Sequence, residues 1–362
     1  MKKIAKMSLV AALAISGLTS ASAVDLTEAI KGVKVSGFVS YTMEKVNNSN
    51  KATADKDGQH DLDIRIQAVI PVNDMVTATI RLDEKEDDDE KEDGVDSSSL
   101  SLEVDRAYFT YKNSMFTTNF GLMSAPLTDG SNADGISFSK DFGAIALTAG
   151  YAYSNATTAN GADDLAYITA NGSIDPVSYY VTYVAQIGTV GTAKTDANFL
   201  ALGLSGNIEM ISLGLDYAQM TGLDGTKDQN QVKVSIGADL GMVSLGLAYA
   251  ANDKDGGETT VSQDDTAASN ISVAGIELQD HADASAIQAS IAFDINATNN
   301  VKLTYVSLDQ DVSGTNDMTA YKLTYTNKMS SNFSVYANYE STDIDNTNND
   351  KSELTLGAKY SF

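Results

Sequence analysis

The chain has 362 residues, with no cysteine, no tryptophan and only three prolines, which excludes a disulfide-stapled fold and thiol chemistry. Its formal net charge of −25 argues against nucleic acid or another anionic surface as a partner and favours cations and neutral solutes. The slightly negative mean hydropathy does not exclude a membrane protein, because strands that alternate apolar and polar residues average to this value.

A secretory signal peptide is predicted at the start of the chain. Three lysines precede the short apolar stretch Met7–Leu18, and the small residues Ala21-Ser22-Ala23 follow it. We expect cleavage after Ala23, so that residues 1–23 are the signal peptide and 24–362 the mature domain. The alternative, an N-terminal membrane anchor, is disfavoured because the stretch is too short to span a bilayer as a helix. Loss of the three lysines would lower the formal charge by three, to −28.

The remainder reads as one repeated hairpin, with about 18 strands joined alternately by short turns and longer polar loops. An even number of strands returns both termini to the same side. Without the two shortest strands, Ile136–Ser139 and Leu165–Ala170, 16 would remain. The predicted strands are Val33–Glu44, Asp61–Val72, Met75–Glu84, Leu100–Lys112, Met115–Ser124, Ile136–Ser139, Ala144–Tyr153, Leu165–Ala170, Val177–Gln186, Phe199–Ser205, Met210–Gln219, Gln231–Asp239, Met242–Ala250, Ala286–Asn296, Val301–Leu308, Thr319–Asn327, Phe333–Tyr339 and Glu353–Phe362.

Each predicted strand carries one apolar and one polar row. In the second strand, Leu62, Ile64 and Ile66 alternate with Asp63, Arg65 and Gln67. In a membrane barrel the apolar row faces lipid, whereas in a soluble β-sandwich it forms the core. Alternation alone does not separate the two. The signal peptide, the number of similar hairpins and the 17 tyrosines, typical of membrane-interface girdles, favour an all-β, transmembrane, antiparallel up-and-down barrel.

The last strand also alternates, and the chain ends on an aromatic residue, Phe362. In Gram-negative bacteria, a terminal amphipathic strand that ends in phenylalanine resembles the signal recognised by the barrel assembly machinery of the outer membrane. The resemblance implies that Tyr360 and Phe362 form an assembly signal and that this machinery is a partner.

Two further segments carry a resemblance to a family. They are Leu26-Thr27-Glu28-Ala29-Ile30-Lys31-Gly32-Val33-Lys34-Val35-Ser36-Gly37, and Arg106-Ala107-Tyr108-Phe109-Thr110-Tyr111 with Phe116, Phe120, Gly121 and Ala125-Pro126-Leu127-Thr128-Asp129. They resemble the major outer membrane protein porins of epsilon-proteobacterial type, which are general trimeric bacterial porins. The resemblance implies a homotrimer of water-filled channels for small hydrophilic solutes and ions, with about 16 to 18 strands. General members carry an arginine where this chain reads Gly121-Leu122-Met123-Ser124, so a full basic ladder is not expected.

Candidate constriction residues follow from this interpretation. The segment Pro126–Asp134 would supply Asp129 and Asp134 if it folds into the pore; the alternative is an ordinary surface loop. Three arginines, Arg65, Arg81 and Arg106, lie on consecutive predicted strands and point inward if the alternation holds. They could face acidic groups across the pore and set a transverse field, or they could pair with Asp63, Asp83 and Glu103 and hold the inner wall. Four lysines also fall on lumen-facing rows: Lys34, Lys302, Lys322 and Lys359.

The acidic segment Asp83–Asp96 is the one candidate cation site. Its carboxylates at Asp87, Asp88, Asp89 and Glu90 would bind Ca²⁺ or Mg²⁺, which prefer oxygen ligands, or would form a solvated external loop. No other cofactor is expected. The two histidines are assigned to loops, and neither stands with a serine and an acid on a strand, so an enzyme is not expected. The longest loop, Asp255–Ala284, is interpreted as variable surface or a partner contact.

Two functions are compatible with these patterns. The first is a diffusion channel of the Gram-negative outer membrane that prefers cations, because the chain is strongly acidic. The alternative is a structural or adhesive barrel that acts through its surface loops. The strand count favours the channel, because 16 or more strands leave an aqueous lumen whereas eight strands fill it with side chains.

Overall fold

The computed structural model describes residues 32–49, 56–84, 102–126, 132–153, 164–187, 189–190, 193–194, 198–222, 228–253, 272–273, 276–278, 281, 283–311, 316–345 and 350–362. Within these ranges the strands of the main sheet are β1 Lys34–Asn48, β2 Lys56–Asn73, β3 Val76–Glu84, β4 Leu102–Lys112, β5 Thr117–Ser124, β6 Asn132–Asp141, β7 Ile145–Tyr153, β8 Asp164–Ile174, β9 Val177–Ile187, β12 Asn198–Ile208, β13 Ile211–Thr221, β14 Gln229–Asp239, β15 Val243–Asn252, β18 Ala284–Asn296, β19 Asn299–Gln310, β20 Met318–Lys328, β21 Phe333–Ile344 and β22 Lys351–Ser361. Two small hairpins, β10 Thr189–Val190 with β11 Ala193–Lys194, and β16 Ser272–Val273 with β17 Ile276–Glu277, belong to connections. No helix in the described part of the chain is long and apolar enough to cross a bilayer.

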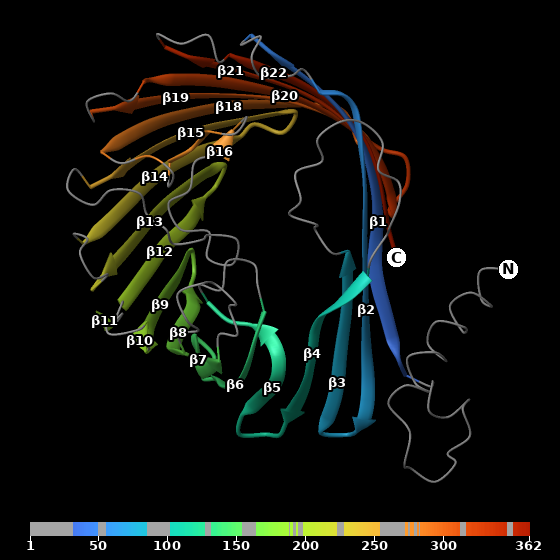
Figure 1. The fold of residues 1–362 in the computed structure, drawn as a ribbon, viewed down its shortest axis with the longest axis vertical. Helices are drawn as coiled ribbons and strands as arrows, with labels where there is room; N and C mark the ends of the chain where they lie inside the picture. Colours follow the sequence, from blue (N-terminus) through green and yellow to red (C-terminus); the bar gives the residue numbers. More distant parts are fainter. Residues whose placement is uncertain are drawn as a thin grey trace, which may run out of the picture.

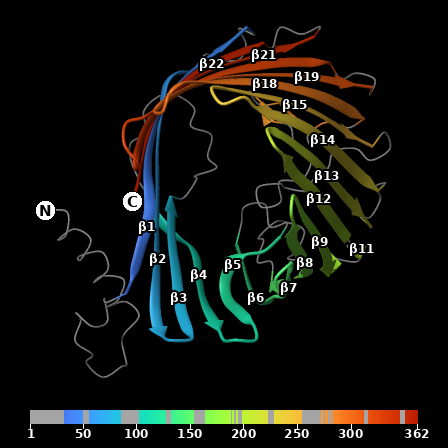
Figure 2. The same cartoon turned by 180° about the vertical axis from the view of Figure 1, so that it is seen from behind.

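The main sheet is an 18-stranded closed barrel. Every strand pairs antiparallel with its neighbours in the chain, and β1 pairs with β22 to close the cylinder. Figures 1 and 2 show the strands in sequence order around the wall. The predicted fold is therefore confirmed. Both of the shortest predicted strands are present and longer than expected, as β6 and β8, so the count is 18.

The first and last strands meet at the rim that carries the short turns. The amide N–H of Gly37 donates to the Phe362 carbonyl, and that of Phe362 donates to the Gly37 carbonyl, each at 3.0 Å. Several turns at this rim use an asparagine or aspartate side chain to accept backbone N–H groups, as Asn73 does from Met75 and Val76, both at 2.9 Å. This is the reason such residues favour turns. The same arrangement occurs at Asn113, Asp141, Asp239 and Asn296.

The apolar rows lie on the outside of the barrel and are exposed, as lipid-facing rows must be and as a sandwich core would not be. Tyrosines gather on this face toward the long-loop ends of the strands: Tyr41, Tyr183, Tyr249, Tyr305, Tyr321 and Tyr339. Phenylalanines gather toward the short-turn ends: Phe109, Phe120, Phe138 and Phe293. Two aromatic girdles at opposite ends are typical of a barrel whose middle band contacts lipid tails.

Several boundaries differ from those predicted, because pairing continues beyond the apolar alternation. Strand β2 begins at Lys56 rather than Asp61, and its pairing with β1 extends to Val46. His60 therefore lies in a strand rather than a loop, with its Nδ1 2.6 Å from the Tyr41 hydroxyl. Polar residues form such extensions, so the alternation of apolar residues gives no sign of them.

Candidate pore-lining site

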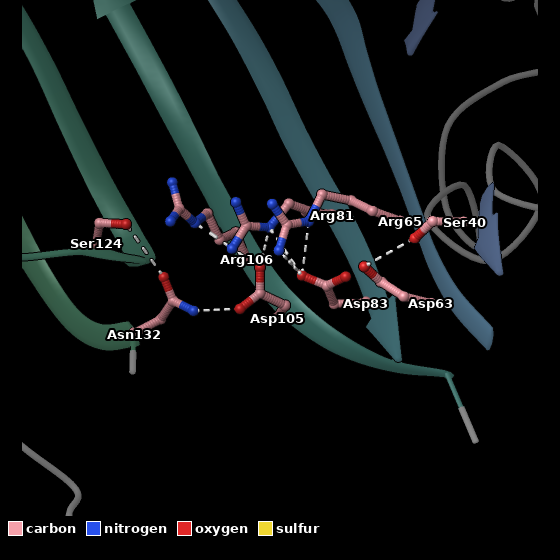
Figure 3. Close-up of polar contacts among 9 residues, drawn as sticks. All are labelled: Ser40, Asp63, Arg65, Arg81, Asp83, Asp105, Arg106, Ser124 and Asn132. Atoms are coloured by element: carbon pink, nitrogen blue, oxygen red, sulfur yellow. Dashed lines mark hydrogen bonds and ion pairs between the residues drawn. The ribbon is translucent and has the colours of Figure 1, made fainter. Parts of the chain in front are cut away.

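Three arginines lie side by side on the inner row of adjacent strands, on β2, β3 and β4 (Figure 3). The Arg65 Nε donates to Asp83 Oδ2 at 2.7 Å, and a second guanidinium nitrogen lies 2.6 Å from the same oxygen. The Arg81 Nε donates to Asp105 and lies 3.8 Å from Asp83. The Arg106 Nε lies 3.8 Å from Asp105. Guanidinium and carboxylate groups therefore alternate along this part of the wall, which we call the charged ladder.

A β-bulge brings Asp105 into the charged ladder. Arg81 pairs with Arg106, and the next residue, Leu82, pairs with Val104, which leaves Asp105 as an extra residue on β4. A bulge lets two consecutive residues of one strand share a face. Val104 is therefore exposed on the apolar face. In a regular strand it would share a face with Arg106, two residues later, but Arg106 points inward.

The prediction that Glu103 pairs with one of the arginines is wrong. Asp105 is the carboxylate that does so. Strict alternation turns Asp105 toward lipid, so the alternation by itself does not point to this residue. A signal was present in the sequence: Leu102 and Val104 are apolar at even positions, whereas Ala107 and Phe109 are apolar at odd positions. Such a change of phase inside one strand indicates an inserted residue between the two runs.

The centre of the charged ladder is paired and largely shielded from water, whereas Arg65 at its edge is 40% exposed. The side chains of Arg81, Asp83 and Asp105 are only 12%, 15% and 15% exposed. Asp63, a predicted partner, instead accepts a 3.4 Å hydrogen bond from the Ser40 hydroxyl. Of the two alternatives, pairing along the inner wall is therefore the one that applies to Arg65 and Arg81. When the neighbouring Asp63 is counted with the charged ladder, three arginines stand with the three aspartates 63, 83 and 105, and their formal charges balance.

Neighbouring polar groups extend the charged ladder on both sides. On one side, Asn132 Nδ2 donates to Asp105, and the Ser124 hydroxyl donates to Asn132 Oδ1 at 3.4 Å (Figure 3). On the other side, the Phe38 ring has the Lys359 ammonium 3.7 Å from its centroid and the Arg65 guanidinium carbon at 5.3 Å. Cations over an aromatic face are stabilised by the ring quadrupole. The network therefore runs from β22 through β1 to β6.

The other predicted lumen lysines lie on inner rows of the closing strands. Lys322 on β20 forms an ion pair with Glu340 on β21. Lys34 shares its row with Phe38, and Lys302 shares its row with the buried Thr304. Together with the charged ladder, they place the lumen charges of the described residues mainly on the strands from β19 through β22 to β4.

The opposite part of the wall has mainly small residues. Its inner rows on β12 to β18 carry serine and glycine: Gly203, Ser205, Ser212, Gly214, Ser235, Gly237, Gly246 and Ser290. A concavity of about 350 Å³ lies over this region, lined by Tyr180, Asp216 and several of these residues. Asp216 stands opposite Lys233 in the register, so the charges of this pair balance.

Two parts of the predicted site are corrected or fall outside the described residues. Asp134 is not in a loop: it lies in β6, on the same row as the exposed Ile136 and Phe138. It therefore belongs to the apolar face, and its predicted place in the constriction is wrong. Asp129, the acidic residues Asp87, Asp88, Asp89 and Glu90, and residues 1–23 lie outside the described part of the chain. Among the described residues no cluster of metal ligands is present.

Part of the longest loop packs inside the barrel, which corrects its interpretation as surface. Leu278 is fully buried against the inner rows of β15, β18, β19 and β20, among them Ala250, Val306 and Leu308. The Asn252 Nδ2 donates to the carbonyls of Leu278 and His281, at 2.7 and 2.5 Å. One apolar residue, Leu278, and one side-chain amide, that of Asn252, hold this segment in place. The loop is polar overall, so its composition gives no sign of this packing.

Replacing Leu278 with alanine is expected to release this segment from the wall. Truncation of a buried leucine costs about 2–5 kcal/mol. We expect this loss to be large enough to detach a segment that is held by one buried side chain and two hydrogen bonds. Proteinase K added to the long-loop side should then cut near His281 in Leu278→Ala but not in the unmodified protein. A matched control is Leu303→Ala, because Leu303 is exposed on the lipid face. Equal resistance of Leu278→Ala and the unmodified protein would contradict the inward packing.

Comparisons with known proteins agree with this geometry. A family model described as Gram-negative porin matches residues 8–362. Among solved structures, OccK3 (OpdO) of Pseudomonas aeruginosa is 13% identical with a TM-score of 0.68, covering 93% of this chain and 97% of that one. OpdQ of the same species is 14% identical with a TM-score of 0.66, covering 92% and 99%. OccAB4 of Acinetobacter baumannii is 12% identical with a TM-score of 0.67, covering 91% and 98%.

No curated protein matches the chain significantly. The structural neighbours, at 12–14% identity, show the fold alone. The family model spans almost the whole chain and agrees with the closed barrel, its lipid-facing girdles and its polar lumen. The porin resemblance is thereby confirmed at the level of the family, and the finer epsilon-proteobacterial type stays a prediction. This chain belongs to the Gram-negative porin family and is a β-barrel of the outer membrane.

Proposed function

We propose that the protein is an open diffusion channel that passes small hydrophilic solutes and ions, with a moderate preference for cations. The family and the fold are those of channels rather than enzymes. The observation that carries the proposal is the closed 18-stranded barrel with polar inner rows, because a barrel of this strand number encloses an aqueous lumen. The paired charges of the ladder supply a hydrated wall without a strong field of one sign.

The cation preference rests on where the negative charge lies. The charges of the ladder and Asp63 balance, so the excess of acidic residues lies elsewhere, for example in the sequence 85–96 between β3 and β4. Acidic groups around the mouth would concentrate cations there. The Debye length is about 8 Å at physiological salt, which is short compared with the width of a porin mouth. The preference should therefore be moderate and should fall as salt rises.

Assembly in the membrane is the second part of the proposal. The signal peptide of residues 1–23 and the terminal Tyr360 and Phe362 support export followed by insertion through the barrel assembly machinery. The resemblance to general porins supports a homotrimer. The alternative function, a structural or adhesive barrel acting through its loops, has no supporting contact among the described residues, and the family does not favour it.

Liposome swelling tests the channel. Purified protein reconstituted in liposomes should admit uncharged sugars at rates that fall steadily with solute size, without saturation. Liposomes with heat-unfolded protein provide the control. Swelling no faster than this control for the smallest sugars would contradict an open channel and would favour the structural alternative.

A further inference from the structure

On the inner face, the rings of three tyrosines each cover a glycine that stands directly opposite on the neighbouring strand. The pairs are Tyr167 with Gly150, Tyr180 with Gly203, and Tyr336 with Gly357. A Cβ atom built on any of these glycines would overlap the tyrosine ring. None of the three glycines has a left-handed backbone, so the glycine is required by space and not by conformation. Each ring therefore occupies the place of the missing side chain.

The Tyr180 ring lies along the wall and not across the lumen. Tyr180 is on β9, and its hydroxyl donates to Asp216 Oδ1 on β13 at 3.3 Å, two strands away. To reach Asp216, the ring crosses β12 at Gly203, the residue that pairs with Asp216. A side chain at this position of β12 would block that path.

Tyr167 shows the same arrangement on another part of the wall. It is on β8, crosses β7 at Gly150, and its hydroxyl is hydrogen-bonded to Ser137 on β6. Packing of an aromatic ring over a cross-strand glycine recovers contact that the glycine lacks. Recurrence with the same geometry at separate places indicates a rule of this wall rather than an accident of one site.

Two of the pairs have the same position along their strands, counted from the short-turn rim, and lie on nearly opposite sides of the barrel. Tyr180 is the fourth residue of β9, and Tyr336 is the fourth residue of β21. Strands β9 and β21 are eight places apart around the 18-stranded barrel. Rings that left the wall at these two positions would approach each other across the lumen.

We propose that Gly203 and Gly357 determine the size of solute that the channel admits, because they let Tyr180 and Tyr336 lie flat against the wall. The inference rests on the proposed channel function and assigns residues that limit its width. An alanine in either position leaves no room for the ring, which must turn toward the lumen. For Gly203 this also breaks the bond between the Tyr180 hydroxyl and Asp216.

Single-channel conductance and the size of polyethylene glycol that enters the pore test the inference. Gly203→Ala and Gly357→Ala should lower the conductance and the size limit. The double variant Gly203→Ala/Tyr180→Ala should restore both. The control is Gly214→Ala, also on an inner row, where the added Cβ meets only the Ser235 side chain, with its hydroxyl at 2.5 Å, and that hydroxyl can rotate away. Conductance of Gly203→Ala equal to that of Gly214→Ala would overturn the inference.

Two further measurements cover the remaining outcomes. Should the glycine variants fail to assemble, Tyr180→Ala should conduct only slightly better than the unmodified protein, and a large increase would show that the ring projects and would overturn the inference. Should the unmodified protein not conduct, the proposed function fails, and a crystal structure of Gly203→Ala decides the ring position by itself. A ring turned into the lumen supports the inference, whereas a ring still against the wall contradicts it.

Discussion

Replacing Asp105 with asparagine is expected to weaken the barrel and the proposed preference for cations at once. Asp105 is the carboxylate between Arg81 and Arg106, and the Arg81–Asp105 pair is largely shielded from water. Removing one partner of a buried pair leaves an uncompensated charge and costs on the order of 3 kcal/mol. The inner wall also gains one net positive charge, which favours anions.

The loss of stability should appear as a lower urea midpoint for unfolding in lipid vesicles, and the change of selectivity as a shifted reversal potential. Glu103→Gln is the matched control, since it removes the same charge from an exposed residue of the same strand. It should change the midpoint little. Equal losses of stability in the two variants would show that the bulge does not bring Asp105 into the ladder.

Deleting Phe362 is expected to reduce the amount of protein in the outer membrane far more than its export. The residue exchanges two backbone hydrogen bonds with Gly37 where β22 closes onto β1, and its ring stacks with that of Tyr360 at 6.2 Å. Deletion removes both the seam contacts and the aromatic end of the predicted assembly signal. Periplasmic protein should accumulate while the folded outer-membrane form declines.

Phe362→Ala separates the two causes, because it keeps the backbone hydrogen bonds and removes only the ring. A defect as large as that of the deletion would assign the effect to the ring and the signal. A much smaller defect would assign it to the seam. Outer-membrane levels of the deletion equal to those of the unmodified protein would contradict both explanations.

The architecture was predictable because lipid and water impose different chemistry on alternate residues. The rows of Leu62 and Asp63, and the asparagine at the Asn73 turn, identify strands and connections by local rules. These rules were sufficient for all 18 strands, including the short apolar run Ile136–Ser139. Strand ends were less predictable, since pairing of polar residues such as His60 leaves no periodic signal.

The site was less predictable because it depends on departures from alternation and on contacts distant in sequence. One extra residue at Asp105 changes which carboxylate meets Arg81, and a strict period of two assigns it to the wrong face. The prediction for Asp134 was wrong for the opposite reason. This residue was assigned to a loop, but it is part of the regular strand β6 and lies on the outward face of that strand. Leu278 is buried by strands β15 to β20, which no local pattern reveals.

The reversal potential of single channels in a KCl gradient, measured at low and at high salt, tests the central claim most directly. The proposed water-filled lumen, with balanced charges on its wall and an acidic mouth, predicts stable, ohmic conductance. The reversal potential should have the sign of a cation preference, and it should shrink toward zero as salt rises. An anion-preferring potential in the unmodified protein, or the absence of any conducting step from correctly folded barrels, would contradict the account.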